Sequence, residues 1–248
     1  MTEPPSTDPL KPKYKRVLLK MSGEAFGHSG QSGISINETM RIAEQLKRVS
    51  AKGVQLAVVV GGGNILRGAE FTAGTSVIKE STAHYMGMLA TIMNGMAIQE
   101  ALESIGCATR VMTALRLDNV AEFFIRRRAI RHLEKGRIVI LAGGTGNPFV
   151  TTDSAAALRG VELDANILLK ATRVDGIYSD DPEKNPHAIR YEKLTYQQVF
   201  RDTLRVMDLA AVELCQKSKL PIMVFNYKRE GNLERAIAGQ PIGTFVCE

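Results

Sequence analysis

The chain of 248 residues has no tryptophan and only three cysteines, and both shortages narrow the classes of protein to which it can belong. Cys107, Cys215 and Cys247 are scattered and form no CxxC pair, which argues against a disulfide framework and a zinc knuckle. We therefore expect the protein to work in a reducing compartment, the cytoplasm. Aromatic residues are only 6% of the chain, so its basic clusters lack the stacking partners of nucleic-acid surfaces, and we expect no nucleic-acid partner.

Long hydrophobic runs are absent as well. The longest apolar stretch, YMGMLATIMNGMAI (85–98), is too short to span a bilayer and contains Asn94, so we expect no membrane segment. The first residues, MTEPPSTDPLKPK, contain no apolar signal-peptide core, and they predict a disordered tail over residues 1–13. Residues 14–248 contain no clear linker and are predicted to form a single domain.

The charge balance is positive, with a formal net charge of +6 and a sequence pI of about 9.3. Such an excess favours anionic partners, but it does not distinguish nucleotides from other anions. Part of it is concentrated at residues 126–131, where four arginines fall in a predicted helix. We interpret this run as a solvated helix face.

Short apolar segments alternate with segments of helical periodicity along the chain. Strands are predicted over residues 15–21, 54–60, 107–113, 137–143, 166–172 and 220–226. Helices are predicted over residues 35–53, 81–106, 117–135, 153–163, 194–203, 208–219 and 232–239. This alternation is typical of parallel βαβ units, and the strands are apolar on both faces. The predicted fold is therefore an α/β fold, a three-layer αβα sandwich around a mainly parallel sheet.

The predicted helix over residues 81–106 has a methionine stripe and two interior glycines, Gly87 and Gly95. Each glycine weakens a helix by roughly 1 kcal/mol relative to alanine, so we expect a close neighbour at both positions. The methionines, at positions 86, 88, 93 and 96, indicate core packing or a subunit interface.

The ends of the predicted strands carry the polar residues that suggest chemistry. One strand ends at Lys20, another at Gly61–Gly63 with Arg67 close behind, a third at GGTGNPFVTTDSA (143–155), and a fourth at Lys170. In open parallel sheets, ligands bind beyond the carboxyl ends of the strands. Glycine-rich turns present backbone amides to phosphate oxygens, and the cations neutralise phosphate charge. Asp153 is a candidate for orienting the lysines or holding Mg²⁺.

Each of these signals has an alternative structural interpretation when it is taken singly. Lys20 is compatible with the exposed end of a strand, and Asp153, Thr151 or Thr152 with a helix N-cap. The chain lacks GxxxxGK[ST], which excludes a P-loop, and GGGNIL is not GxGxxG. Its four histidines show no HExxH spacing, and His132 is predicted to lie on a helix surface. Only the combination of these residues on one rim therefore supports a phosphate site.

Six segments resemble the bacterial uridylate kinases of the amino acid kinase family. They are YKRVLLKMSGEAF, VVVGGGNILRG, YMGMLATIMNGMA, LAGGTGNPFVTTDSAAALRG, LLKATRVDGIYSDDP and LRVMDLAA. The resemblance runs from about Tyr14 to the C-terminus, and the block 141–182 is its most specific part. It implies the transfer of a phosphoryl group from ATP to UMP with Mg²⁺, in pyrimidine nucleotide biosynthesis. It also implies a homohexamer, activation by GTP and inhibition by UTP.

The resemblance assigns roles to positions that match the family's motifs. The implied catalytic residues are Lys20, Arg67, Asp153 and Lys170. The implied ATP-binding residues are Lys20, Met21, Ser22, Gly23, Gly63, Arg67, Thr172, Tyr178 and Asp181. The implied UMP-binding residues are Gly62, His84, Thr145, Gly146, Asn147, Pro148, Phe149, Val150, Thr151 and Thr152. The segment of the GTP response is implied at His28, Ser29, Gly30, Gln31, Ser32 and Gly33. The resemblance assigns no metal ligand in the protein.

One position departs from the family pattern. His84 stands where an acidic residue is expected to bind the ribose of UMP, so the sugar contact and its pH dependence differ from the pattern. Two other functions stay open on the residues themselves. One is another small-acid kinase of the family, which makes an acyl or carbamoyl phosphate, and the other is a non-catalytic nucleotide- or oxyanion-binding protein.

Overall fold

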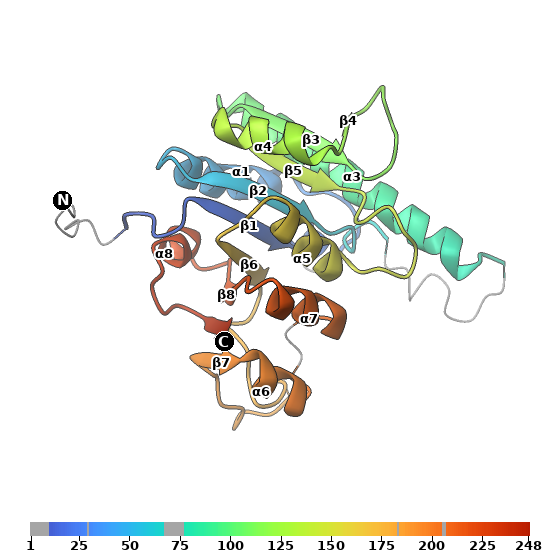
Figure 1. The fold of residues 1–248 in the computed structure, drawn as a ribbon. Helices are drawn as coiled ribbons and strands as arrows, with labels where there is room; N and C mark the ends of the chain where they lie inside the picture. Colours follow the sequence, from blue (N-terminus) through green and yellow to red (C-terminus); the bar gives the residue numbers. More distant parts are fainter. Residues whose placement is uncertain (1–9, 29, 67–76, 183, 205–206) are drawn as a thin grey trace.

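The computed structural model describes residues 10–28, 30–66, 77–182, 184–204 and 207–248, and a nine-stranded sheet runs through its centre (Figure 1). The strand order is β4-β3-β5-β2-β1-β6-β8-β9-β7. The strands are β1 Arg16–Met21, β2 Gln55–Val60, β3 Thr109–Thr113, β4 Glu122–Phe123, β5 Ile138–Ala142, β6 Ile167–Thr172, β7 Lys193–Thr195, β8 Ile222–Asn226 and β9 Thr244–Cys247. Neighbouring strands are parallel except β8 and β9. The predicted α/β fold is confirmed.

Helices cover both faces of this sheet, so the molecule has three layers. They are η1 Gly23–Phe26, α1 Ile36–Ser50, α3 Glu80–Ser104, α4 Arg126–Glu134, α5 Thr152–Glu162, α6 Tyr196–Arg201, α7 Leu209–Lys217 and α8 Asn232–Ile237. The hydrophobic core under α1, α3 and α8 takes Val17 and Leu19 from β1. The core under α4, α5, α6 and α7 takes Leu18 from the same strand. Alternate residues of a central strand are therefore buried on opposite faces.

The sequence predicted the six strands in the middle of the sheet, but it was wrong at the edges. The segment 117–135 is not one helix, because Glu122–Phe123 pairs with β3 and helix α4 begins only at Arg126. The edge strands β7 and β9 were not predicted. Both are short, and short strands carry little periodic signal of their own. They pair with each other in parallel, which only the tertiary structure brings about.

Helix α3 lies close to the sheet at only one of its two interior glycines. A Cβ atom at Gly95 would lie 3.3 Å from the Cβ of Ala142, whereas one at Gly87 would meet nothing within 4 Å. The expected close neighbour is thus confirmed for Gly95; at Gly87 the position of a side chain is open among the described residues, although the backbone of Gly62 lies against the Gly87 carbonyl. No helix in the described part of the chain is both long and apolar enough to cross a membrane.

The predicted tail, residues 1–13, falls mostly outside the described residues, which begin at residue 10. Its last residue is attached to the domain, because the backbone amide of Lys13 donates to the carbonyl of Ile237 in α8 at 2.9 Å. The side chain of Lys52 donates to the carbonyl of Leu10 at 3.1 Å. The tail and the single domain otherwise stay predictions.

Candidate active site

Two lysines lie side by side at the carboxyl end of the sheet. Strands β1 and β6 are parallel neighbours, and their register pairs Lys20 with Lys170. Side chains alternate between the two faces of a strand, so Lys20 lies on the same face as Leu18, and Lys170 on the same face as Leu168. This is the face that α5 covers. Lys20 is only 8% exposed. Like charges directly opposite each other destabilise a sheet, so this pair requires a compensating anion.

Asp153 supplies the compensating charge from the first turn of α5. Its Oδ1 lies 2.9 Å from Nζ of Lys20, and its Oδ2 lies 2.8 Å from Nζ of Lys170. The positive end of the helix dipole also favours a carboxylate at this place. Two ammonium groups share one carboxylate, so the three side chains together keep one net positive charge. The structure therefore brings together three of the four residues that were implied to be catalytic; Arg67 lies outside the described residues.

The pKa values of this cluster follow from burial and from the neighbouring charges. Burial by itself would raise the pKa of Asp153, but the charges of Lys170 and Lys20 outweigh it and hold that pKa below its ordinary value. For Lys170, burial is the largest effect and lowers the pKa; Asp153 opposes this shift, and Lys20 adds to it. The cluster thus has a stably ionised carboxylate and a lysine that gives up its proton more readily than an exposed one.

The N-cap of α5 is Thr151, which settles one of the alternatives raised by the sequence. Its hydroxyl oxygen accepts the backbone amides of Asp153 and Ser154 at 3.1 and 3.2 Å. Asp153 does not cap the helix, and its carboxylate is instead used by the lysines. The Thr151 hydroxyl also donates to Asp208, whose Oδ1 accepts the Ser154 hydroxyl at 2.9 Å.

Asp208 is a residue that the sequence analysis missed. Besides holding the start of α5, it is the N-cap of α7, because its Oδ1 accepts the amide of Ala211 at 2.8 Å. Its negative charge also raises the pKa of Lys170, although less than Asp153 does. The available signal was an Asp immediately before a helical run, within the motif LRVMDLAA.

The glycine loop after β2 lies against the loop after β1. A Cβ atom at Gly23 would lie 2.4 Å from the amide nitrogen of Gly63, and one at Gly61 would lie 2.7 Å from the amide nitrogen of Gly23. Any side chain there would separate the two loops, which explains why both positions are glycine. The segment from Lys20 to Gly23, implied to face ATP, is therefore in direct contact with Gly61–Gly63.

A polar cavity of about 270 Å³ connects this glycine loop to the implied regulatory segment. Its lining includes Gly63, Glu24 and Arg173, together with His28, Gly30, Gln31 and Ser32. Glu24 and Arg173 form an ion pair at 2.9 Å. Gly33 follows directly and donates its amide to the carbonyl of Asn64 at 2.7 Å. Ser29 lies outside the described residues.

The loop between β5 and α5 holds most of the residues that were implied to bind UMP, and His84 lies beside it. Phe149 has a left-handed backbone, with a φ of 65°, and an exposed side chain. Its ring lies 4.8 Å from the imidazole of His84 in the first turns of α3. His84 is also 3.7 Å from Glu80, one turn earlier. His84 is therefore beside the implied UMP loop, and among the described residues it contacts an acidic neighbour on its own helix, Glu80.

The residues implied for the adenosine end of ATP are only partly together. Tyr178 and Asp181 line a cavity of about 560 Å³ beyond β6. Thr172 is not part of that lining, and its hydroxyl donates to the carbonyl of Val174 at 2.7 Å. Thr172 therefore supports the start of the loop that forms the cavity wall.

The donor set in this region suits a magnesium ion that arrives with its nucleotide. Among the described residues, no group of three or more His, Cys, Asp and Glu side chains has the arrangement of a metal site. Both oxygens of Asp153 face lysines. Mg²⁺ is commonly held by substrate phosphates and one or two carboxylates, so a magnesium ion here would be held mainly by its nucleotide, with Asp153 as a carboxylate close to the loops that were implied to face phosphate.

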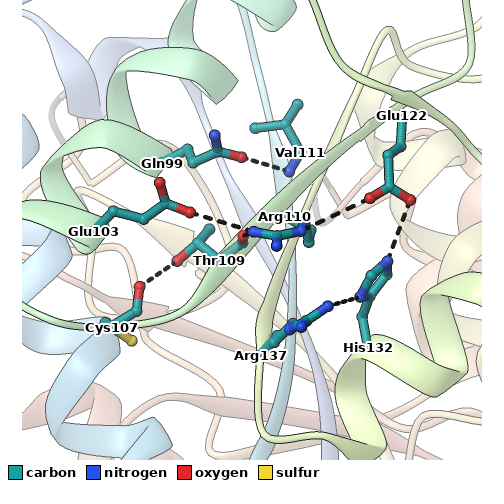
Figure 2. A network of polar contacts seen from close by, with 9 residues as sticks. All are labelled: Gln99, Glu103, Cys107, Thr109, Arg110, Val111, Glu122, His132 and Arg137. Carbon is teal, nitrogen blue, oxygen red and sulfur yellow. Dashed lines mark hydrogen bonds and ion pairs between the residues drawn. The ribbon is translucent and has the colours of Figure 1, made fainter.

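A second charged network lies near the β4 edge of the sheet, around β3 and α4 (Figure 2). Glu122 lies between Arg110, at 3.8 Å, and His132, at 3.2 Å, and His132 also contacts Arg137 at 3.0 Å. The His132 side chain is only 13% exposed. His132 lies on helix α4, as predicted, but its side chain is largely covered. The prediction missed its contact with Glu122, because the wrongly predicted helix 117–135 hid the strand that contains Glu122.

The chain matches the model of the amino acid kinase family over residues 15–226. It is 52% identical over 241 residues to the chloroplastic uridylate kinase PUMPKIN of Arabidopsis thaliana. The aligned region covers 97% of this chain and 70% of that protein. The structure resembles UMP kinase from Bacillus anthracis, with a TM-score of 0.88, 37% identity and coverage of 94% and 96% of the two chains. It also resembles UMP kinase from Ureaplasma parvum, with a TM-score of 0.89, 33% identity and coverage of 95% and 100%.

Proposed function

The chain belongs to the amino acid kinase family, and we propose on this basis that it is a UMP kinase, which transfers the γ-phosphoryl group of ATP to UMP and releases UDP and ADP. This step belongs to pyrimidine nucleotide biosynthesis. The similarity to UMP kinases over nearly the whole chain supports the reaction. The single structural observation that carries the proposal is the Lys20–Asp153–Lys170 cluster at the carboxyl end of the sheet.

The cluster suits phosphoryl transfer because that reaction requires positioning and charge neutralisation more than covalent help. The attacking group is a phosphate oxygen of UMP, whose second pKa is about 6, so it is already ionised at neutral pH. A general base is therefore unnecessary. Two anionic nucleotides repel each other, and Lys20 and Lys170 offset this repulsion while Asp153 keeps both ammonium groups in place.

The remaining site residues are assigned by the same proposal. Lys20 to Gly23, Gly63 and Arg67 face the ATP phosphates, and Thr172, Tyr178 and Asp181 border its adenosine. Gly62, His84 and residues 145–152 hold UMP. The close approach of Gly23 to Gly62 supports this arrangement, because Gly23 is assigned to ATP and Gly62 to UMP, and the two segments lie side by side. When bound with ATP, Mg²⁺ neutralises phosphate charge.

Assembly and regulation are proposed as well: six copies associate, GTP activates and UTP inhibits. The exposed face of α3 supports association with further copies of this chain, because it presents four apolar side chains at helical spacing, Tyr85, Leu89, Met93 and Met96. Analytical ultracentrifugation of the protein, with Met93→Glu as the disrupted variant, tests this surface. The cysteines at 107, 215 and 247 are free thiols, which supports a location in the reducing cytoplasm.

The experiment that tests the function is a coupled assay of ADP release with four acceptors. UMP is expected to be phosphorylated, and CMP, glutamate and carbamate are expected to react far more slowly. Turnover with glutamate or carbamate would indicate a small-acid kinase. Nucleotide binding without turnover would indicate a binding protein. Repeating the UMP assay with GTP and with UTP measures regulation.

A further inference from the structure

Helix α3 carries two buried polar side chains that the proposed function does not use. Thr91 and Asn94 lie three residues apart, on the same face of the helix, and are 3% and 0% exposed. A buried polar group costs free energy unless it is hydrogen-bonded, so both require partners. Their partners lie in the glycine loops that follow β2 and β5.

Asn94 forms a reciprocal amide pair with Asn64, the residue after Gly63. Nδ2 of Asn94 donates to Oδ1 of Asn64 at 2.7 Å, and Nδ2 of Asn64 donates to Oδ1 of Asn94 at 3.0 Å. The second hydrogen of Asn94 goes to the carbonyl of Gly61 at 2.8 Å, and that of Asn64 goes to the carbonyl of Gly33 at 2.9 Å. All four amide hydrogens are therefore used. If either side-chain amide were rotated by about 180°, its NH₂ group would face the other NH₂ group and its oxygen would face the other oxygen.

These hydrogen bonds connect three segments that are distant in the sequence. Asn94 holds the glycine loop at Gly61, and Asn64 holds Gly33 through its side chain and through its backbone carbonyl. Thr91 adds a fourth segment, because its hydroxyl oxygen accepts the amide of Gly143 at 2.7 Å. Successive turns of α3 thus hold the loops at the ends of two neighbouring strands of the sheet, β2 and β5.

The glycine loop has no side chains with which to fix its own position. A Cβ atom at Gly62 would lie 2.8 Å from the carbonyl oxygen of Gly87 and 2.9 Å from the Cβ of Ala90, so the loop lies directly on α3. Backbone contact alone permits sliding along the helix. The amide pair prevents it, because any shift of Gly61 or Asn64 would leave buried amide hydrogens unpaired.

We propose that Asn64 and Asn94 are positioning residues for phosphoryl transfer, which fix the Gly61–Gly63 loop on α3 and couple it to Gly33. This inference rests on the proposed function, because it assumes that Gly62 and Gly63 face the transferring phosphate. Misplacement of reacting groups by about 1 Å can reduce a rate about 10²-fold, so the loop's position matters more to turnover than to binding.

The test is a double-mutant cycle with Asn64→Ala, Asn94→Ala and both together. Each single variant is expected to lower kcat about tenfold or more and to change KM for UMP and ATP much less. The double variant is expected to be no slower than the worse single one, because either change breaks the same pair. The matched control is Thr109→Val, a buried hydroxyl at the opposite end of the sheet that bonds the carbonyl of Cys107 at 3.0 Å. Its kcat is expected to stay within about twofold.

Hydrogen exchange gives a readout that does not depend on activity. In Asn94→Ala, the amides of Gly30–Gly33 are expected to exchange faster, although Asn94 makes none of the hydrogen bonds to this segment. Unchanged exchange, an unchanged kcat or independent effects of the two substitutions would overturn the positioning role. If Asn94→Ala does not fold, Asn64→Ala decides by the same rates and by exchange at Gly61–Gly63. An inactive wild-type protein would refute the proposed function, while exchange would still judge the amide pair.

Discussion

The cluster of Lys20, Asp153 and Lys170 and the network around Glu122 are both built from ion pairs, but they differ in net charge and in how deeply their side chains are buried. In the first, two buried cations share one carboxylate. Burial lowers the pKa of Lys170, whereas the pKa of Asp153 is lowered by the two lysine charges, which outweigh its burial. In the second, Glu122 and Glu103 lie beside Arg110 at a partly exposed edge, where water screens the charges (Figure 2). The comparison teaches that a count of ion pairs does not locate a site, whereas a buried excess of one charge does.

The largest effect is expected from Lys20→Ala. Removing one of the two cations that are proposed to face the phosphates is expected to reduce kcat by about 10³-fold or more. The fold is expected to persist, because Asp153 keeps its contact with Lys170. Steady-state kinetics measures the loss of rate, and circular dichroism measures the fold. The control is Lys135→Ala, which removes an exposed lysine at the end of α4. Near-normal turnover of the Lys20 variant would refute its role.

A smaller loss of rate but a larger loss of stability is expected from Asp153→Asn. Without the carboxylate, the two ammonium groups repel each other in a buried place, and the free energy of unfolding is expected to fall by about 3–5 kcal/mol. Urea denaturation measures the fall. Since the pKa of Asp153 is below its ordinary 3.8 in the folded protein, its stabilisation is present above that pH and disappears as pH falls through the folded value. A difference between variant and wild type that does not shrink in acid would contradict this.

An effect confined to high pH is expected at Lys170. Burial lowers the pKa of this lysine from its ordinary 10.5, so its charge is lost as pH rises through a value below 10.5. The profile of kcat/KM, which reports the free enzyme, is therefore expected to fall on the alkaline side within that range. Lys170→Arg keeps its charge there, and its profile is expected to lack this limb even if its overall rate is lower. An identical limb in both proteins would assign it to another group.

The smallest effect is expected from Glu122→Gln in the balanced network. The lost contacts with Arg110 and His132 are partly exposed, so the free energy of unfolding is expected to change by less than about 1 kcal/mol. The rate without effectors is expected to stay within about twofold. The same denaturation and kinetic assays apply, which makes this variant the counterpart of Asp153→Asn. A loss of activity as large as at Asp153 would remove the distinction between the two networks.

The middle of the sheet and the shared location of Lys20, Lys170 and Asp153 were predictable, because both follow from apolar periodicity and from the rule that ligands bind at strand ends. The edges were less predictable. Strands β4, β7 and β9 have two to four residues, and pairing rather than propensity makes them strands. For Asp153 the sequence left two roles open, because an Asp at a helix start fits a cap as well as a partner of the lysines, and only the structure chose between them.

The sequence by itself determined the fold class, the family and the set of charged residues at the rim, because these are written in local patterns of apolar, glycine and basic residues. Only the tertiary structure decided which side chains meet. The register of β1 against β6 brings Lys20 to Lys170, and the packing of α3 on the glycine loop brings Asn94 to Asn64. The members of these two pairs are 150 and 30 positions apart in the sequence. Local propensity carries no information about contacts over that separation.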